Sequence, residues 1–65
     1  MHLTELESDV VEWFEAYEGL HTLVEIFARF KGVKESELRD TIDNLIDIGV
    51  LFSCETITGP KYGLM

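Results

Sequence analysis

Apolar residues recur at intervals of three and four in the first part of the chain, the spacing of one face of an α-helix. This stripe comprises Leu3, Leu6, Val10, Trp13, Phe14 and Tyr17. Thr4 stands near its start and Glu7 follows three residues later, a capping-box pattern in which each side chain can bind the other's free backbone N–H. The pattern predicts a helix over residues 4–17 that ends at residues 18–19, with a short extended stretch around residues 20–21.

Two further helices are predicted on the same grounds. Thr22 and Glu25 form a second capping box, and this helix is expected to run to residue 30 or 31. Its apolar positions are Leu23, Val24, Ile26, Phe27 and Phe30. The third helix is expected over residues 35–48, with Leu38, Ile42, Leu45, Ile46 and Ile48 as core candidates. Gly32 and Gly49 follow these two helices, where a residue in the left-handed conformation can end a helix and turn the chain.

The pattern changes after Gly49. Residues 50–57 are rich in strand-forming types, residues 58–60 read as a turn, and residues 61–64 can return as a second strand. The sequence therefore predicts a single domain over residues 1–65 of α+β class, mainly helical, with three helices and a C-terminal β-hairpin.

This order of elements resembles the winged helix-turn-helix family. Ala28, Gly32 and Val33 match the family's turn, in which a small residue is followed four positions later by glycine and then by an apolar residue. The small residue is expected to let two helices cross closely. Further matches are the inward positions of the third helix and the step into the wing, namely Leu38, Ile42, Leu45, Gly49, Val50 and Leu51.

The resemblance implies a DNA-binding regulator of transcription, because most winged helices place the third helix in the major groove and the hairpin against a neighbouring backbone or minor groove. A minority bind proteins instead. Charge distinguishes these two functions. The chain has 65 residues, with 13 acidic and 5 basic side chains and a net charge of −8. This net charge opposes binding to phosphates, although all the basic residues lie in the helix-turn-helix and the wing.

The third helix itself favours a protein partner. Its expected outward positions are Glu35, Ser36, Arg39, Asp40, Asp43, Asn44 and Asp47. Among them Arg39 is the one basic residue and four are carboxylates, which DNA would repel. We therefore predict a small acidic module, a regulator or inhibitor in transcription or other DNA-processing machinery, that binds a protein with a basic surface. The predicted contact residues are Glu35, Arg39, Asp40, Asp43 and Asp47.

Three alternatives remain open. A DNA-binding regulator, acting as a homodimer, would use Lys31, Lys34, Ser36, Arg39 and Lys61. Here Lys34 occupies the position where the family has a small polar N-cap. The exposed acidic line of the first helix could instead mimic DNA phosphates or simply be solvated; it comprises Glu5, Asp9, Glu12 and Glu15. The chain could also be a piece of a larger protein.

Enzymatic chemistry has little support in the sequence. It contains no phosphate-binding glycine loop and no nucleophile with an evident base, so we predict no catalytic residues and no cofactor. The two histidines lack the spacing of a metal site. Cys54, the single cysteine, excludes an intramolecular disulfide and is expected to be buried. No apolar run reaches the roughly 18 residues of a membrane span, and the expected location is cytoplasmic. Trp13 and Phe14 are adjacent, so one of the two rings is expected at the edge of the core, and exposure of Trp13 would indicate a dimer contact.

Overall fold

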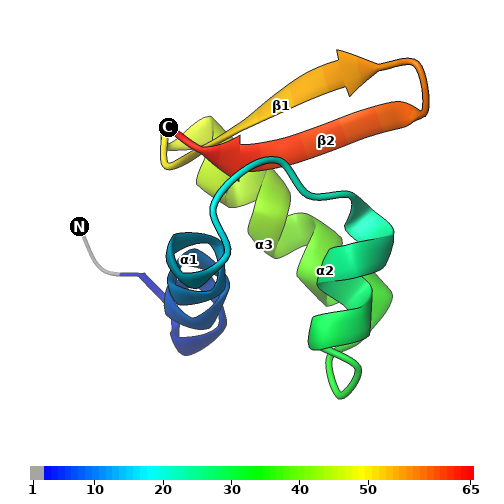
Figure 1. Ribbon diagram of the computed structural model, residues 1–65. Coiled ribbons are helices and arrows are strands. Elements are labelled where there is room, and N and C mark those ends of the chain that lie inside the picture. Colours follow the sequence, from blue (N-terminus) through cyan, green and yellow to red (C-terminus); the bar gives the residue numbers. More distant parts are fainter. Residues whose placement is uncertain (1–2) are drawn as a thin grey trace.

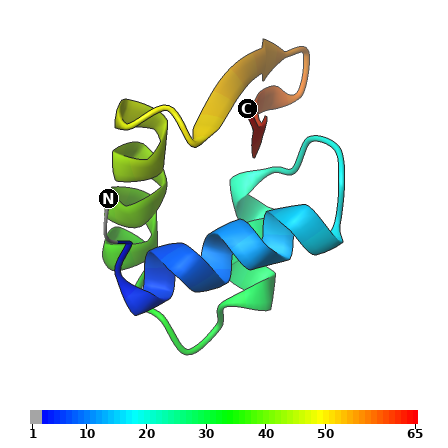
Figure 2. The same ribbon diagram turned by 90° about the vertical axis from the view of Figure 1, so that its left-hand side faces the viewer.

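Three helices and an antiparallel hairpin follow one another in the computed structural model, which describes residues 3–65 (Figure 1). The elements are α1 (Glu5–Ala16), α2 (Leu23–Arg29), α3 (Glu35–Asp47), β1 (Leu51–Thr56) and β2 (Gly59–Leu64). α1 runs across α3 and packs against it, while the hairpin covers the other end of α3 (Figure 2). The predicted α+β, mainly helical fold class is confirmed.

Reciprocal capping fixes the start of the first two helices. The Thr4 hydroxyl accepts a hydrogen bond from the Glu7 backbone N–H (3.1 Å), and the Thr4 N–H donates to the Glu7 carboxylate (2.8 Å). Thr22 and Glu25 make the same pair of bonds at 3.3 and 3.2 Å. Both predicted capping boxes are confirmed. Lys34 is the N-cap residue of α3 and forms no side-chain cap, as the sequence indicated.

The core lies where the three helices meet the first strand. It comprises Val10, Phe14, Ile26, Leu38, Ile42, Leu45 and Leu51. Two predicted apolar positions are wrong. Tyr17 is 58% exposed because α1 ends at Ala16 and the backbone of Tyr17 is no longer helical. Val24 is 75% exposed because a position two residues before Ile26 lies on the opposite side of a helix.

The two glycines expected to be left-handed behave differently. Gly49 has a φ of 82°, and the N–H groups of Gly49 and Val50 donate to the carbonyls of Ile46 and Leu45, which is a Schellman motif at the end of α3. Gly32 does not have a positive φ, so this prediction is wrong. The chain turns there through a hydrogen bond from the Val33 N–H to the Phe30 carbonyl (3.0 Å), a turn that needs no left-handed residue.

Ala28 also differs from the expectation. It is exposed, so it does not provide the close helix crossing that its small size suggested. The sequence therefore contains the pattern of Ala28 followed by Gly32, but Ala28 does not make the close contact between helices that was expected to explain it.

The hairpin has a shorter and earlier turn than predicted. Its register pairs Leu51 with Leu64 and Thr56 with Gly59, so the loop consists of Ile57 and Thr58 alone. The second strand accordingly begins at Gly59 rather than at residue 61. Ile57, which was expected to continue the first strand, is fully exposed at the tip.

One further backbone pair ties the hairpin to the helices. The N–H groups of His21 and Tyr62 each donate to the other's carbonyl, both at 2.8 Å. This bridge confirms the extended stretch predicted around residues 20–21. It gives β2 a hydrogen-bonded neighbour on each side, with β1 on one and the loop between α1 and α2 on the other.

Candidate functional site

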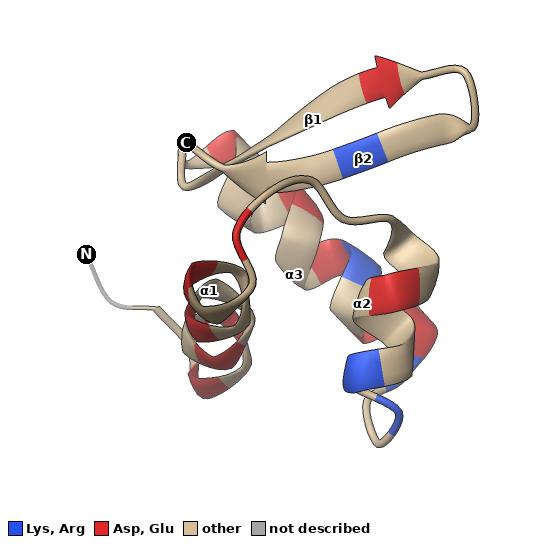
Figure 3. Cartoon of the chain, viewed as in Figure 1, with Lys and Arg blue, Asp and Glu red and all other residues tan. Residues whose placement is uncertain are grey.

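The outward face of α3 carries the residues predicted to contact a protein partner. All of them are exposed: Glu35, Arg39, Asp40, Asp43 and Asp47. Acidic segments recur along this helix in Figure 3. Helical periodicity was sufficient to place these side chains, because alternate faces of an amphipathic helix separate core from solvent.

Arg39 is engaged within the protein. Its guanidinium lies 3.2 Å from the Glu35 carboxylate one turn earlier, and its Cζ lies 5.9 Å from the centre of the Phe27 ring on α2. Both charged side chains are more than half exposed, so water screens the pair and its contribution to stability is small. Arg39, the single basic residue of α3, thus contacts Glu35 and Phe27. The carboxylates of Asp40, Asp43 and Asp47 have no ion-pair partner among residues 3–65.

Four of the five residues predicted to bind DNA lie in the α2–α3 turn and on α3, and the fifth, Lys61, lies in the hairpin. Lys31 and Lys34 are exposed and lie in the turn between α2 and α3, and Ser36 is exposed in the first turn of α3. Lys61 lies within β2, where it pairs with Cys54 and is half-buried. The hairpin and the α2–α3 turn are at opposite ends of the molecule (Figure 1).

The acidic line of α1 is exposed throughout. Glu5, Asp9, Glu12 and Glu15 face solvent, and none forms an ion pair within the described part of the chain. The Lys and Arg residues of the chain lie in α2, the α2–α3 turn, α3 and β2. α1 therefore has no basic residue to offset its own acidic side chains. Acidic surface thus extends over two helices.

Glu7 differs from these neighbours because it is buried, with 5% of its surface exposed. Its carboxylate accepts a hydrogen bond from the Thr4 N–H at one oxygen and from the Asn44 side-chain amide at the other. The Thr4 N–H, followed by the Asn44 amide, holds the pKa of this carboxyl below its ordinary value, while burial acts in the opposite direction. The sequence indicated the cap but not Asn44, which it counted as simply outward.

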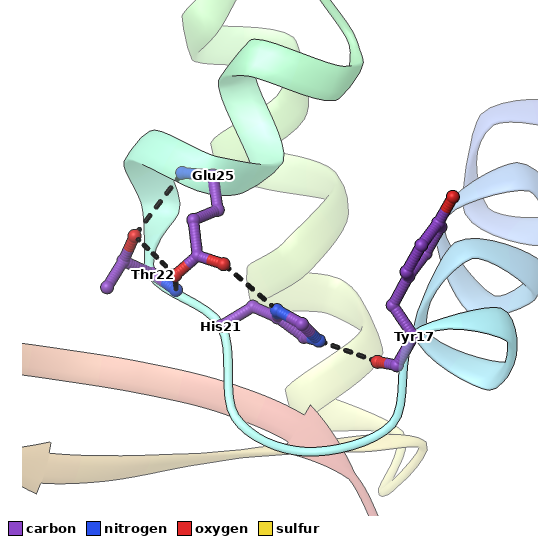
Figure 4. Close-up of polar contacts among 4 residues, drawn as sticks. All are labelled: Tyr17, His21, Thr22 and Glu25. Carbon is purple, nitrogen blue, oxygen red and sulfur yellow. Dashed lines mark hydrogen bonds and ion pairs between the residues drawn. The ribbon is translucent and has the colours of Figure 1, made fainter.

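His21 connects the first two helices. Its Nε2 donates to the carbonyl oxygen of Tyr17 (2.6 Å), and its Nδ1 lies 3.1 Å from the Glu25 carboxylate (Figure 4). The ring therefore bridges the end of α1 and the first turn of α2. The hydrogen bond from His21, followed by the Thr22 N–H, keeps the pKa of the Glu25 carboxyl below its ordinary value.

The His21 ring also packs against aromatic side chains. Its centroid lies 4.6 Å from that of Trp13 and 5.5 Å from that of Phe14. Trp13 further contacts Tyr17 and Phe30 at centroid distances of 5.7 and 6.5 Å. Trp13 is half-buried and Phe14 is buried, which confirms that one of these two adjacent rings lies at the edge of the core.

The structure also shows how the potential metal ligands and the single cysteine are placed. Residues 3–65 contain no cluster of three or more potential metal-ligating His, Cys, Asp or Glu side chains. Cys54 was expected to be buried, and this is wrong: its side chain is exposed. Cys54 lies beyond the part of β1 that covers the core, because burial along this strand is complete at Leu51 and falls away toward the hairpin tip.

No family model, curated protein or solved structure matches this chain significantly, so the function is argued from the structure. No helix of the described residues has the length and apolar character required to cross a bilayer.

Proposed function

We propose that the chain is a small, non-enzymatic winged helix-turn-helix module that binds a basic surface on a protein partner through the outward face of α3. The order of three helices and a C-terminal hairpin supports the family. The exposed Ala28 and the ordinary φ of Gly32 mean that this support comes from the order of elements rather than from the turn motif.

One observation carries the proposed function. On α3, Arg39 is already paired with Glu35, which leaves Asp40, Asp43 and Asp47 exposed without a cation among residues 3–65. A DNA groove would oppose these carboxylates, whereas Lys and Arg side chains of a protein would neutralise them and gain favourable orientation and faster encounter. The biological setting that we propose is transcription or other DNA-processing machinery in the cytoplasm.

The test compares two ligands on the isotope-labelled protein by NMR. A decalysine peptide represents a basic protein surface, and a short DNA duplex represents the alternative. At about 50 mM salt we expect the peptide to shift the amides of α3 and the duplex to leave them unchanged. Duplex shifts at Lys31, Lys34, Ser36 and Arg39 that vanish at about 200 mM salt would instead establish direct DNA binding.

Matched variants locate the binding charge. Replacing Asp40 and Asp43 by Asn removes two charges from α3, and replacing Asp9 by Asn and Glu12 by Gln removes two from α1. Weaker decalysine binding for the α3 pair than for the α1 pair supports the proposal. Equal weakening would show a diffuse charge effect and would contradict a specific role for α3.

A further inference from the structure

A cleft of about 430 Å³ opens where the end of α1, the following loop and the hairpin come together. Its apolar lining comprises Phe14, Leu20, Phe52 and Leu64, and two carboxylates, Glu15 and Glu18, border it. No α3 residue lines the cleft, so it is separate from the acidic face proposed above.

Gly63 determines the shape of this cleft. It pairs with Phe52 across the hairpin, so the Phe52 side chain lies on the face of the sheet where Gly63 has no side chain. A methyl group at Gly63 would lie 3.0 Å from Leu20 Cδ2 and 3.2 Å from Phe52 Cε1. Leu20 and Phe52 therefore approach each other over the bare backbone of Gly63, and a side chain there would force them to move.

The cleft retains uncovered apolar surface. Leu20 is 41% exposed although it touches the sheet, and Phe52 is only partly buried. A leucine and a phenylalanine left in contact with water beside a concave surface can release that water to an apolar side chain of a ligand.

The acidic border of the cleft favours a positively charged ligand. Glu15 and Glu18 border the cleft without an ion-pair partner among residues 3–65, and its lining includes no basic residue. A second copy of this chain carries the same net charge of −8 and would be repelled. A segment with Lys or Arg beside a large apolar residue satisfies both the apolar walls and the acidic border.

From these contacts we propose that the cleft binds a short segment of a partner protein in which a large apolar side chain is flanked by Lys or Arg. The apolar side chain occupies the space between Leu20, Phe52 and Leu64. The flanking cations lie against Glu15 and Glu18. This contact is a second one, independent of α3.

The experiment titrates labelled protein with the synthetic hexapeptide Lys-Arg-Leu-Phe-Arg-Lys. A control peptide, Lys-Arg-Ala-Ala-Arg-Lys, keeps the charge and removes the apolar side chains. We expect the first peptide to shift the amides of Leu20, Phe52 and Gly63 and the control to bind at least about tenfold more weakly, since loss of several buried methylenes costs one decade or more in affinity.

Variants of the protein test both parts of the site. Leu20→Ala is expected to weaken binding of the first peptide about five- to tenfold, whereas Val24→Ala, at a more exposed apolar position on α2, leaves it unchanged. Glu15→Gln with Glu18→Gln weakens binding and reduces its salt dependence. Asp40→Asn with Asp43→Asn leaves the peptide-induced shifts of the Leu20, Phe52 and Gly63 amides unchanged, which separates this site from α3.

Three results would overturn the proposal. The first is equal binding of the two peptides, which would mean that charge alone attracts them. The second is the absence of shifts around the cleft at millimolar peptide. The third is a concentration-dependent change at Leu20 and Phe52 without peptide, which would identify a second copy of the chain as the occupant.

Discussion

The side-chain amide of Asn44 on α3 donates a hydrogen bond to the buried carboxylate of Glu7 on α1. The same carboxylate caps α1 through the Thr4 N–H. A single side chain thus accepts the backbone N–H of the N-cap residue of α1 and also contacts α3. Among the described residues Glu7 is the one charged side chain in the buried class.

Replacing Asn44 by Ala is expected to lower stability more than its exposed position suggests. The substitution leaves one oxygen of the Glu7 carboxylate buried without a donor, and an unsatisfied buried acceptor is costly. Urea unfolding followed by circular dichroism should show a lower midpoint for Asn44→Ala than for the neighbouring control Asp43→Ala. Equal midpoints for the two variants would contradict a structural role for the Asn44–Glu7 contact.

Acid should destabilise the fold through Glu7 and Glu25. The pKa of each carboxyl is lower in the folded protein than its ordinary value of 4.5. Their contribution is therefore complete above that pH and is lost as the pH falls through the lower, folded pKa values. Thermal unfolding between pH 7 and pH 2.5 should show a falling midpoint below about pH 4.5. The decline should be shallower in Glu7→Gln than in Glu12→Gln, whose side chain is exposed.

Gly49→Ala should cost about 1–2 kcal/mol, because the φ of 82° that ends α3 is unfavourable for a residue with a Cβ. Gly32→Ala provides the contrast. Its φ is not left-handed and a Cβ there would meet open space, so stability should stay the same or rise by up to about 1 kcal/mol. Chemical denaturation of both variants measures the difference. Similar losses in both would mean that the two turns use glycine for the same reason.

His21 should contribute through both its ring and its nitrogens. His21→Ala removes the stacking on Trp13 and the hydrogen bonds to Tyr17 and Glu25, whereas His21→Phe removes the hydrogen bonds alone. We expect the thermal midpoint to fall in the order wild type, His21→Phe, His21→Ala. Trp13 fluorescence reports the ring contact and should change most in His21→Ala. A midpoint for His21→Phe at or below that of His21→Ala would assign the stabilisation to the hydrogen bonds.

Cys54 should react in the folded state. Its thiol is exposed, so a small aromatic disulfide reagent should modify it completely without denaturant. The rate should be close to that in urea after correction for the solvent. Protection that is lost only on unfolding would show that the thiol is covered in solution.

Most of the fold was predictable because its determinants are local in the sequence. The Thr–Glu spacing of the two capping boxes identifies the starts of α1 and α2, and apolar periodicity identifies the core side of each helix. The same periodicity predicted which α3 residues face solvent, and hence the candidate acidic surface.

The remaining features depend on contacts between distant residues. The Asn44–Glu7 bond joins two helices, and the approach of Leu20 to Phe52 over Gly63 joins a loop to both strands. No spacing rule relates such positions. The exposure of Cys54 was missed for a related reason, since the composition of a strand does not reveal how far along it the helices extend. The cleft was therefore absent from the sequence-based predictions.

The bridge between His21 and Tyr62 limits how the hairpin can move. Because β2 is bonded to β1 on one side and to the α1–α2 loop on the other, the base of the hairpin is anchored at two places. Rotation of the whole hairpin about Gly49 would break the bonds at His21. We therefore expect any bending to be greatest at the outer end around Ile57 and Thr58, beyond the anchored pairs. The base of the hairpin is thus held at a set distance from the helices, and a ligand that contacts both the hairpin tip and the helices must fit that distance.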